Sequence, residues 1–140
     1  MEGTAGLDEL LDDEERHATF HDAELLSVHV DYRTRELVAQ WRLCVGDPDA
    51  SEKPARERRR DGRLTLHGLL FWVVEPPTEV AAKDSLPWLT ADGALSTSTT
   101  ATGRSLAQLL PAGAVGWYLY FSDRNVFAYC GANAARFQWV

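Results

Sequence analysis

The chain has 140 residues, 45% of them hydrophobic and 25% charged, which is the size and composition of a single globular domain covering residues 1–140. Its formal net charge of −7 argues against a general affinity for nucleic acid or for anionic membranes. No apolar run is long enough to cross a bilayer, and the amino terminus lacks the basic and apolar regions of a signal peptide. We therefore expect an acidic, cytoplasmic protein without membrane contact.

The first predicted element is a short helix over residues 7–16. Leu7, Leu10 and Leu11 fall at helical spacing and form one narrow apolar stripe. Acidic side chains crowd the rest of this segment. Such a charge run is typical of a solvated helix face, and the alternative is a docking surface for a basic partner.

Residues 20–45 predict an antiparallel hairpin. Alternation in the first strand assigns its core face to four residues: Leu26, Val28, Val30 and Tyr32. After a polar turn, a second alternation assigns the core face of the next strand to five: Leu37, Ala39, Trp41, Leu43 and Val45. Two alternating runs joined by a short polar link indicate one buried and one solvent-exposed face.

Residues 46–62 predict a long, mobile, solvated loop. It carries a cluster of arginines: Arg56, Arg58, Arg59 and Arg60. A basic run can contact phosphates, but acidic residues interrupt this one and it contains no aromatic residue on which a base could stack. Nucleic-acid binding through these arginines is therefore the less favoured interpretation.

Residues 63–74 predict a strand. Its alternation slips at Gly68, which indicates a bulge or bend, and the apolar run that follows indicates a central strand. Beyond it, Trp88 and its neighbours would pin a loop to the core. Residues 96–102 fit either an edge strand or a polar loop, and residues 106–110 predict a helical turn with Ser105 as its cap.

The last third predicts strands over residues 117–121, 126–130 and 135–140, joined by turns at 122–125 and 131–133. The whole pattern predicts a mainly β (α+β) fold. We expect an antiparallel curved sheet or sandwich with a short amino-terminal helix and one further short helix. An exposed edge of such a sheet makes a homodimer plausible.

The adjacent pair His21–Asp22 is the most suggestive local feature. Neighbours in a strand point to opposite faces, so the two side chains are not expected to act on one atom. We expect Asp22 to accept backbone amides at the start of the strand and His21 to pack at the end of the sheet. The alternative is a role in binding a partner or ligand, shared with His29 and His67 on neighbouring strands.

The sequence contains no phosphate-binding glycine loop, no nucleophile elbow and no paired-cysteine metal site, so no cofactor, metal or catalytic residue is expected. Its two cysteines, Cys44 and Cys130, lie far apart and are expected to be reduced, buried and structural.

The segment Phe20-His21-Asp22-Ala23 followed by a hairpin resembles the opening of a group of small bacterial proteins. The aromatic strand over residues 117–121, with Asp123 in the turn after it, resembles the ending of the same proteins. Some of them are similar to the immunity proteins that accompany polymorphic bacterial toxins. The resemblance implies a non-enzymatic protein that binds another protein, and it assigns no catalytic residue.

We therefore expect a non-enzymatic, immunity-protein-like binding module whose acidic charge suits a basic partner. The alternative is a small-ligand binder or an enzyme whose pocket is lined by His21, His29 and His67.

Overall fold

The computed structural model describes residues 6–78, 80 and 85–140, which form one antiparallel sheet of six strands in the order β1-β2-β3-β6-β5-β4. The strands are β1 (Thr19–Asp31), β2 (Glu36–Cys44), β3 (Arg59–Val74), β4 (Leu89–Ala94), β5 (Val115–Phe121) and β6 (Val126–Trp139). Four short helical elements accompany them: η2 (Leu7–Leu10), α1 (Lys53–Arg56), η3 (Leu95–Thr97) and α2 (Ala101–Ala107). The predicted curved, mainly β fold is confirmed.

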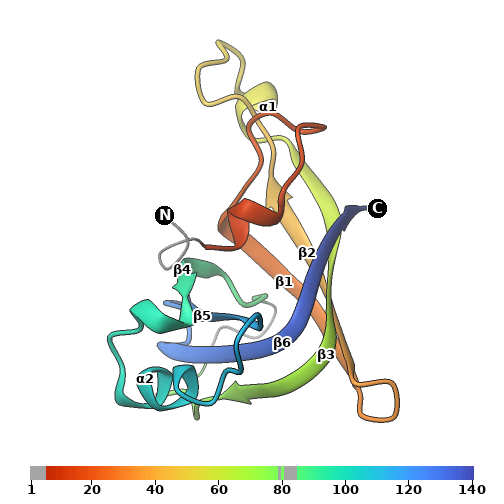
Figure 1. The fold of residues 1–140 in the computed structure, drawn as a ribbon. Coiled ribbons are helices and arrows are strands. Elements are labelled where there is room, and N and C mark those ends of the chain that lie inside the picture. The colour runs from red at the N-terminus through yellow and green to blue at the C-terminus, as the bar shows by residue number, and fades with distance from the viewer. Residues whose placement is uncertain (1–5, 79, 81–84) are drawn as a thin grey trace.

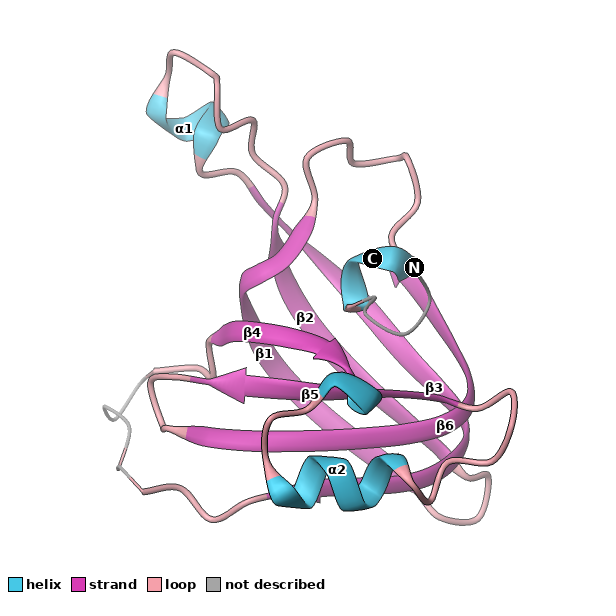
Figure 2. Cartoon of the chain, turned by 60° about the vertical axis from the view of Figure 1, so that its left-hand side comes forward, coloured by secondary structure: helices cyan, strands magenta, loops and turns pink. Residues whose placement is uncertain are grey.

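The sheet curls into a half-barrel (Figure 1). The strands of its second half run across those of its first half at a steep angle (Figure 2), as expected when one twisted sheet turns back over itself. The curl brings the two edge strands, β1 and β4, close together. Glu24 of β1 forms an isolated antiparallel bridge with Trp88, just before β4, and Pro87 O accepts the amide of Leu25 at 2.9 Å.

The concave side of the half-barrel holds one aromatic-rich core. Phe20 contacts both Trp41 and Phe137 edge to face, with ring centroids 5.4 and 5.5 Å apart. Leu7 of η2 is also fully buried in this core, so the amino-terminal segment covers part of the concave side. No helix among the described residues is long and apolar enough to span a bilayer.

The β1–β2 hairpin is present, and all five predicted core residues of its second strand are buried. The prediction for β1 is wrong at two positions. Leu25, rather than Leu26, packs against the core, and Tyr32 lies in the turn with 85% of its surface exposed. The register shift between Leu25 and Ser27 accounts for the first error, because an extra residue moves a side chain to the other face. The second error arises because β1 ends at Asp31, before Tyr32.

The predicted loop over residues 46–62 is shorter than expected, because β3 begins at Arg59 instead of residue 63 and pairs with β2 from Cys44 onward. Gly62 is the reason that the sequence did not predict the earlier start of β3, because a glycine is normally interpreted as a loop residue. It occupies a core-facing position of β3, but a Cβ atom there would lie 2.1 Å from Phe137 Cζ, so the aromatic ring fills the space that a side chain would need.

The expected bend at Gly68 is confirmed by its positive φ of 62° and by a register shift in the β3–β6 pairing. The predicted turn at residues 131–133 is wrong, since β6 runs unbroken from Val126 to Trp139. Gly131 serves packing rather than a turn: a Cβ there would lie 2.6 Å from Phe71 and 2.8 Å from Leu110.

The remaining helical predictions are right in kind and displaced in position. The amino-terminal helix is a single 3-10 turn, Leu7–Leu10, instead of residues 7–16. Residues 96–102 form neither an edge strand nor a simple polar loop, because they contain most of η3 and the start of α2. Thr100, rather than Ser105, caps α2, and its hydroxyl accepts the amide of Gly103 at 3.0 Å.

Candidate functional site

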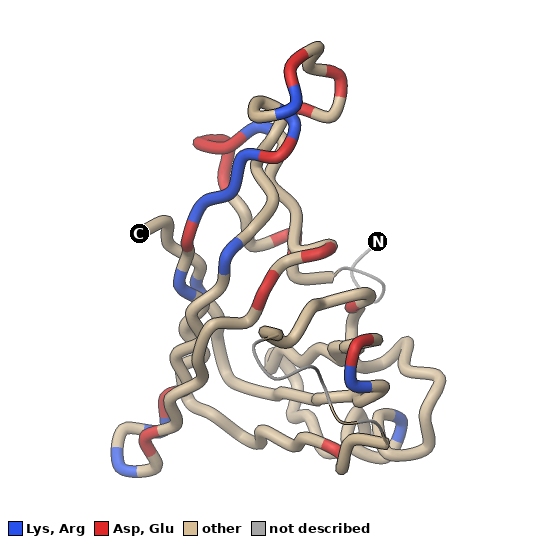
Figure 3. Tube along the Cα trace, turned by 180° about the vertical axis from the view of Figure 1, so that it is seen from behind, with Lys and Arg blue, Asp and Glu red and all other residues tan. Residues whose placement is uncertain are grey.

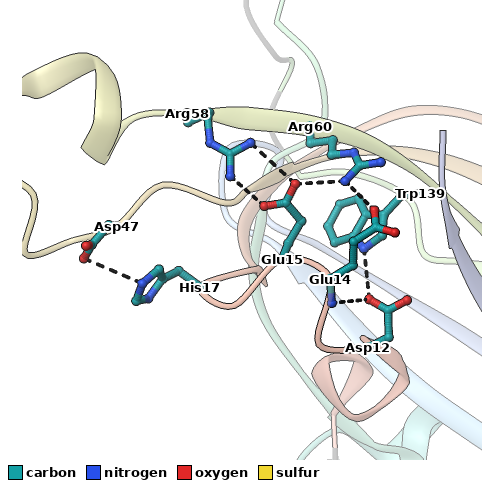
Figure 4. Close-up of polar contacts among 8 residues, drawn as sticks. All are labelled: Asp12, Glu14, Glu15, His17, Asp47, Arg58, Arg60 and Trp139. Atoms are coloured by element: carbon teal, nitrogen blue, oxygen red, sulfur yellow. Dashed lines mark hydrogen bonds and ion pairs between the residues drawn. The ribbon is translucent and has the colours of Figure 1, made fainter.

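Acidic and basic stretches lie side by side at one end of the sheet (Figure 3). Arg58 donates to Glu15 Oε1 at 2.6 Å, while Arg60 donates to Glu15 Oε2 at 2.9 Å and also to Glu14 (Figure 4). The Glu15 side chain is only 10% exposed. Hydrogen bonds from Arg58 and then Arg60 hold the pKa of Glu15 below its usual range. We call these four residues the amino-terminal clasp.

Trp139, near the end of β6, extends the clasp. Its indole N–H donates to Asp12 at 3.2 Å, and the Arg60 guanidinium lies 5.1 Å from the centroid of the same ring (Figure 4). The clasp thus ties the segment after η2 to both β3 and β6.

The clasp changes the interpretation of both charged runs. Within the acidic run, expected either as a solvated helix face or as a docking surface, Glu14 and Glu15 contact the chain's own arginines. In the basic run, Arg58 and Arg60 form ion pairs with these glutamates, and Arg56 donates to the carbonyls of Ala50 and Ser51.

Asp22 has a backbone conformation that the sequence did not suggest. Its φ is +65°, in the left-handed region, and it lies within the first register shift of β1. This turn of the backbone brings His21 Nε2 to 3.6 Å from Asp22 Oδ1, so the expectation that the two side chains point apart is wrong. His21 Nδ1 lies 3.1 Å from the carbonyl of Thr90.

The predicted bond between Asp22 and backbone amides is also wrong for the described residues. Asp22 Oδ1 accepts the indole N–H of Trp88 at 2.8 Å. The predicted role belongs to Asp8, whose carboxylate accepts the amide of Phe20 at 2.7 Å and the hydroxyl of Thr19 at 2.9 Å. A carboxylate does stabilise the start of β1, but it comes from η2.

Beside His21 and Asp22 lies a cavity of about 360 Å³, which we call the Trp88 pocket. It is formed where β1 approaches the segment before β4, and its lining residues are Asp22, Glu24, Arg59, Ser85, Leu86 and Trp88. Trp88 is 48% exposed although its indole nitrogen is bonded. One side of the pocket therefore presents a large aromatic surface in a fixed orientation.

The charges of the Trp88 pocket are mixed and negative in sum. Arg59 donates to the carbonyl of Asp22 at 3.1 Å and lies 3.9 Å from the Glu24 carboxylate. These groups also act on Cys44, which pairs with Arg59 in the sheet. Burial raises the pKa of the Cys44 thiol, Arg59 opposes the rise, and Asp22 and Glu24 add to it.

The other two predicted histidines lie elsewhere. His67 Nδ1 is 2.9 Å from Glu36 Oε2 across β2 and β3, and His29 pairs with Val38 in the half of β1 distant from His21. No histidine lines the Trp88 pocket. None lines the second cavity, about 570 Å³, between the end of β4 and the loop after α2. The described residues contain no group of three or more His, Cys, Asp or Glu arranged to hold a metal ion.

Among the residues that line the Trp88 pocket, sequence reasoning selected Asp22 as a candidate and did not select Glu24, Arg59 or Trp88. The available signal was Trp88 itself, an aromatic residue in a stretch without regular alternation. Its contact with Asp22 spans 66 positions of the chain, and no local pattern predicts such a separation.

Cys130 is buried, and burial raises the pKa of its thiol to about 12, as expected for a structural cysteine.

No protein-family model, curated protein or solved structure matches this chain. Any functional conclusion therefore rests on the geometry of the chain itself.

Proposed function

We propose that this chain is a non-enzymatic protein-binding module, similar in role to an immunity protein, and that its partner contacts the Trp88 pocket. The observation that carries the proposal is a tryptophan that is 48% exposed and yet held by a carboxylate through its indole N–H. Tryptophan is enriched among the residues that dominate protein–protein binding energies. A ring fixed before binding loses little conformational freedom when a partner covers it.

The charges around Trp88 support a basic partner side chain. The carboxylates of Asp22 and Glu24 line the same pocket as the indole ring. A lysine or arginine entering the pocket would meet both opposite charge and an aromatic face. Arg59 already lines this pocket, where its guanidinium donates to the Asp22 carbonyl at 3.1 Å and lies 3.9 Å from the Glu24 carboxylate.

The backbone of Asp22 supports a functional origin for this arrangement. A left-handed conformation at a residue other than glycine costs about 1–2 kcal/mol, although aspartate tolerates it better than most residues. Here the strained conformation places the carboxylate against Trp88 and beside His21.

The test is a binding titration with the protein encoded beside this chain in its genome, comparing wild type with Trp88→Ala. We expect the variant to raise Kd by about 30-fold or more, the loss typical of a dominant interface residue. Tyr32→Ala is the matched control, because it also removes an exposed aromatic side chain, but from the β1–β2 turn.

Circular dichroism must show that both variants are folded at the temperature of the titration, because Trp88→Ala also loses the indole bond to Asp22. If Trp88→Ala binds the partner as tightly as wild type does, the interface does not include the Trp88 pocket. No complex with the neighbouring protein at any concentration would remove the immunity-like role.

A further inference from the structure

The second half of β3 has a strand neighbour on one side only. β2 pairs with β3 as far as His67, whereas β6 continues the pairing to Val74. Beyond the bond from the Leu69 amide to Arg35 O, at 2.7 Å, no described strand pairs with residues 69–74 on the β2 side. This part of β3 runs along the lower rim of the sheet in Figure 1.

This edge lacks the features that normally prevent strands from adding to one another. Its sequence is Leu-Leu-Phe-Trp-Val-Val, six apolar residues without a charge or a proline before Glu75. The lower rim is correspondingly free of charged residues between the β1–β2 turn and Glu75 (Figure 3). Val74 is 53% exposed.

The other two edges are protected. β1 contains two register shifts, carries Asp22 and Glu24, and approaches the segment before β4 through the bridge to Trp88. β4 is only six residues long and has a register shift of its own. Short, irregular and charged edges resist strand addition. The regular part of β1, residues 27–31, includes Ser27, His29 and Asp31, so residues 69–74 of β3 form the entirely apolar segment among the described edges.

We propose that a second copy of this chain pairs here, antiparallel, about a twofold axis that passes between Trp72 of one copy and Trp72 of the other. This register pairs the apolar run with itself, since Leu70 of one copy lies opposite Val74 of the other and Phe71 opposite Val73. Homodimers with twofold symmetry are the commonest oligomers, and each surface patch must then complement itself.

The charges at the two ends of the run fit this axis. Arg35 lies at the Leu69 end, with its guanidinium 3.5 Å from Leu69 O. Glu75 lies at the other end, where its carboxylate accepts the hydroxyl of Tyr129 at 2.8 Å. The twofold axis places Arg35 of each copy beside Glu75 of the other, so two ion pairs flank the paired strands.

Sedimentation velocity over a range of protein concentrations tests the dimer, with Val74→Lys as the disrupting variant. A lysine in an edge strand opposes pairing, so we expect its dimer Kd to rise at least about tenfold. Val140→Lys is the matched control: it makes the same substitution at a valine that is 66% exposed and lies beside Asp61, at the other end of β3.

Arg35→Glu should also weaken the dimer, and adding Glu75→Arg to it should restore affinity if the proposed register is correct. A wild-type protein that stays monomeric at all concentrations overturns the proposal, as does a dimer that Val74→Lys and Val140→Lys affect equally. The surface is separate from the Trp88 pocket, so a failure here leaves the proposed partner site standing.

Discussion

The backbone conformation of Asp22 makes it an exception to the alternation of side chains along a strand. Adjacent strand residues normally point to opposite faces, yet a φ of +65° places the carboxylate of Asp22 within 3.6 Å of the His21 ring. The same angle turns Asp22 toward Trp88. The backbone conformation and the side chain of Asp22 therefore contribute separately to the free energy of unfolding, and substitutions can distinguish the two contributions.

We predict a stability order for substitutions of Asp22. Asp22→Asn keeps an acceptor for the indole and tolerates the left-handed conformation, so it should melt close to wild type. Asp22→Gly loses only the hydrogen bond and should cost about 0.5–1.5 kcal/mol. Asp22→Ala loses the bond and also pays the steric cost of about 1–2 kcal/mol, so it should be the least stable. Denaturant melts measure the order, and an alanine variant as stable as the glycine variant would contradict it.

The amino-terminal clasp joins segments that lie far apart in the sequence. Two oppositely charged runs, more than 40 positions apart, satisfy each other at the end of the sheet. Each run alone suggests an external partner, either a basic protein or a nucleic acid. Once paired, they cover the end of the sheet and leave less charge for either partner.

Breaking the clasp should expose its arginines. We predict that Glu14→Gln combined with Glu15→Gln raises the salt concentration needed to elute the protein from heparin, because Arg58 and Arg60 lose their ion pairs. Glu52→Gln combined with Glu57→Gln changes the net charge equally, in the exposed segment around α1. Equal shifts for the two double variants would show that net charge, rather than the clasp, governs binding.

The clasp should also make stability depend on pH. Because the pKa of Glu15 is lowered on folding, its contribution is fully present above its usual value of 4.5 and disappears as the pH falls through the folded-state value. Wild type should therefore be more stable than Glu15→Gln at pH 7, and the two melting temperatures should converge at acidic pH. A constant difference between the two curves would contradict the assignment.

Sequence patterns predicted the elements that form through neighbouring residues. The β1–β2 and β5–β6 hairpins follow from alternation and short turns, and the turn of the second spans residues 122–125 as expected. The failures arise where distant packing decides the local structure. Gly62 and Gly131 are small because Phe137 and Phe71 need the space, whereas local rules interpret glycine as a loop or turn.

The curl of the sheet creates the candidate site. β1 and β4 are the two edges of the sheet, and the bridge between Glu24 and Trp88 brings them together. The Trp88 pocket exists only because the edges meet, so no single element contains it. His21 and Asp22 could be selected from sequence as candidates, but their aromatic partner could not.

The proposed function and the proposed dimer use different parts of this architecture. The partner site lies where the half-barrel nearly closes, and the dimer surface lies on the rim formed by the second half of β3. One copy could therefore bind a partner and a second copy at the same time, which predicts a complex of two chains with two partners.

Hydrogen exchange of the chain, alone and in complex with the protein encoded beside it, tests whether the Trp88 pocket is the binding site. We predict that binding slows amide exchange in residues 20–25 of β1 and 85–90 before and within β4, while the β1–β2 turn around Tyr32 exchanges as before. A stable complex that protects other segments and leaves both of these unchanged would contradict the assignment of the Trp88 pocket as the binding site.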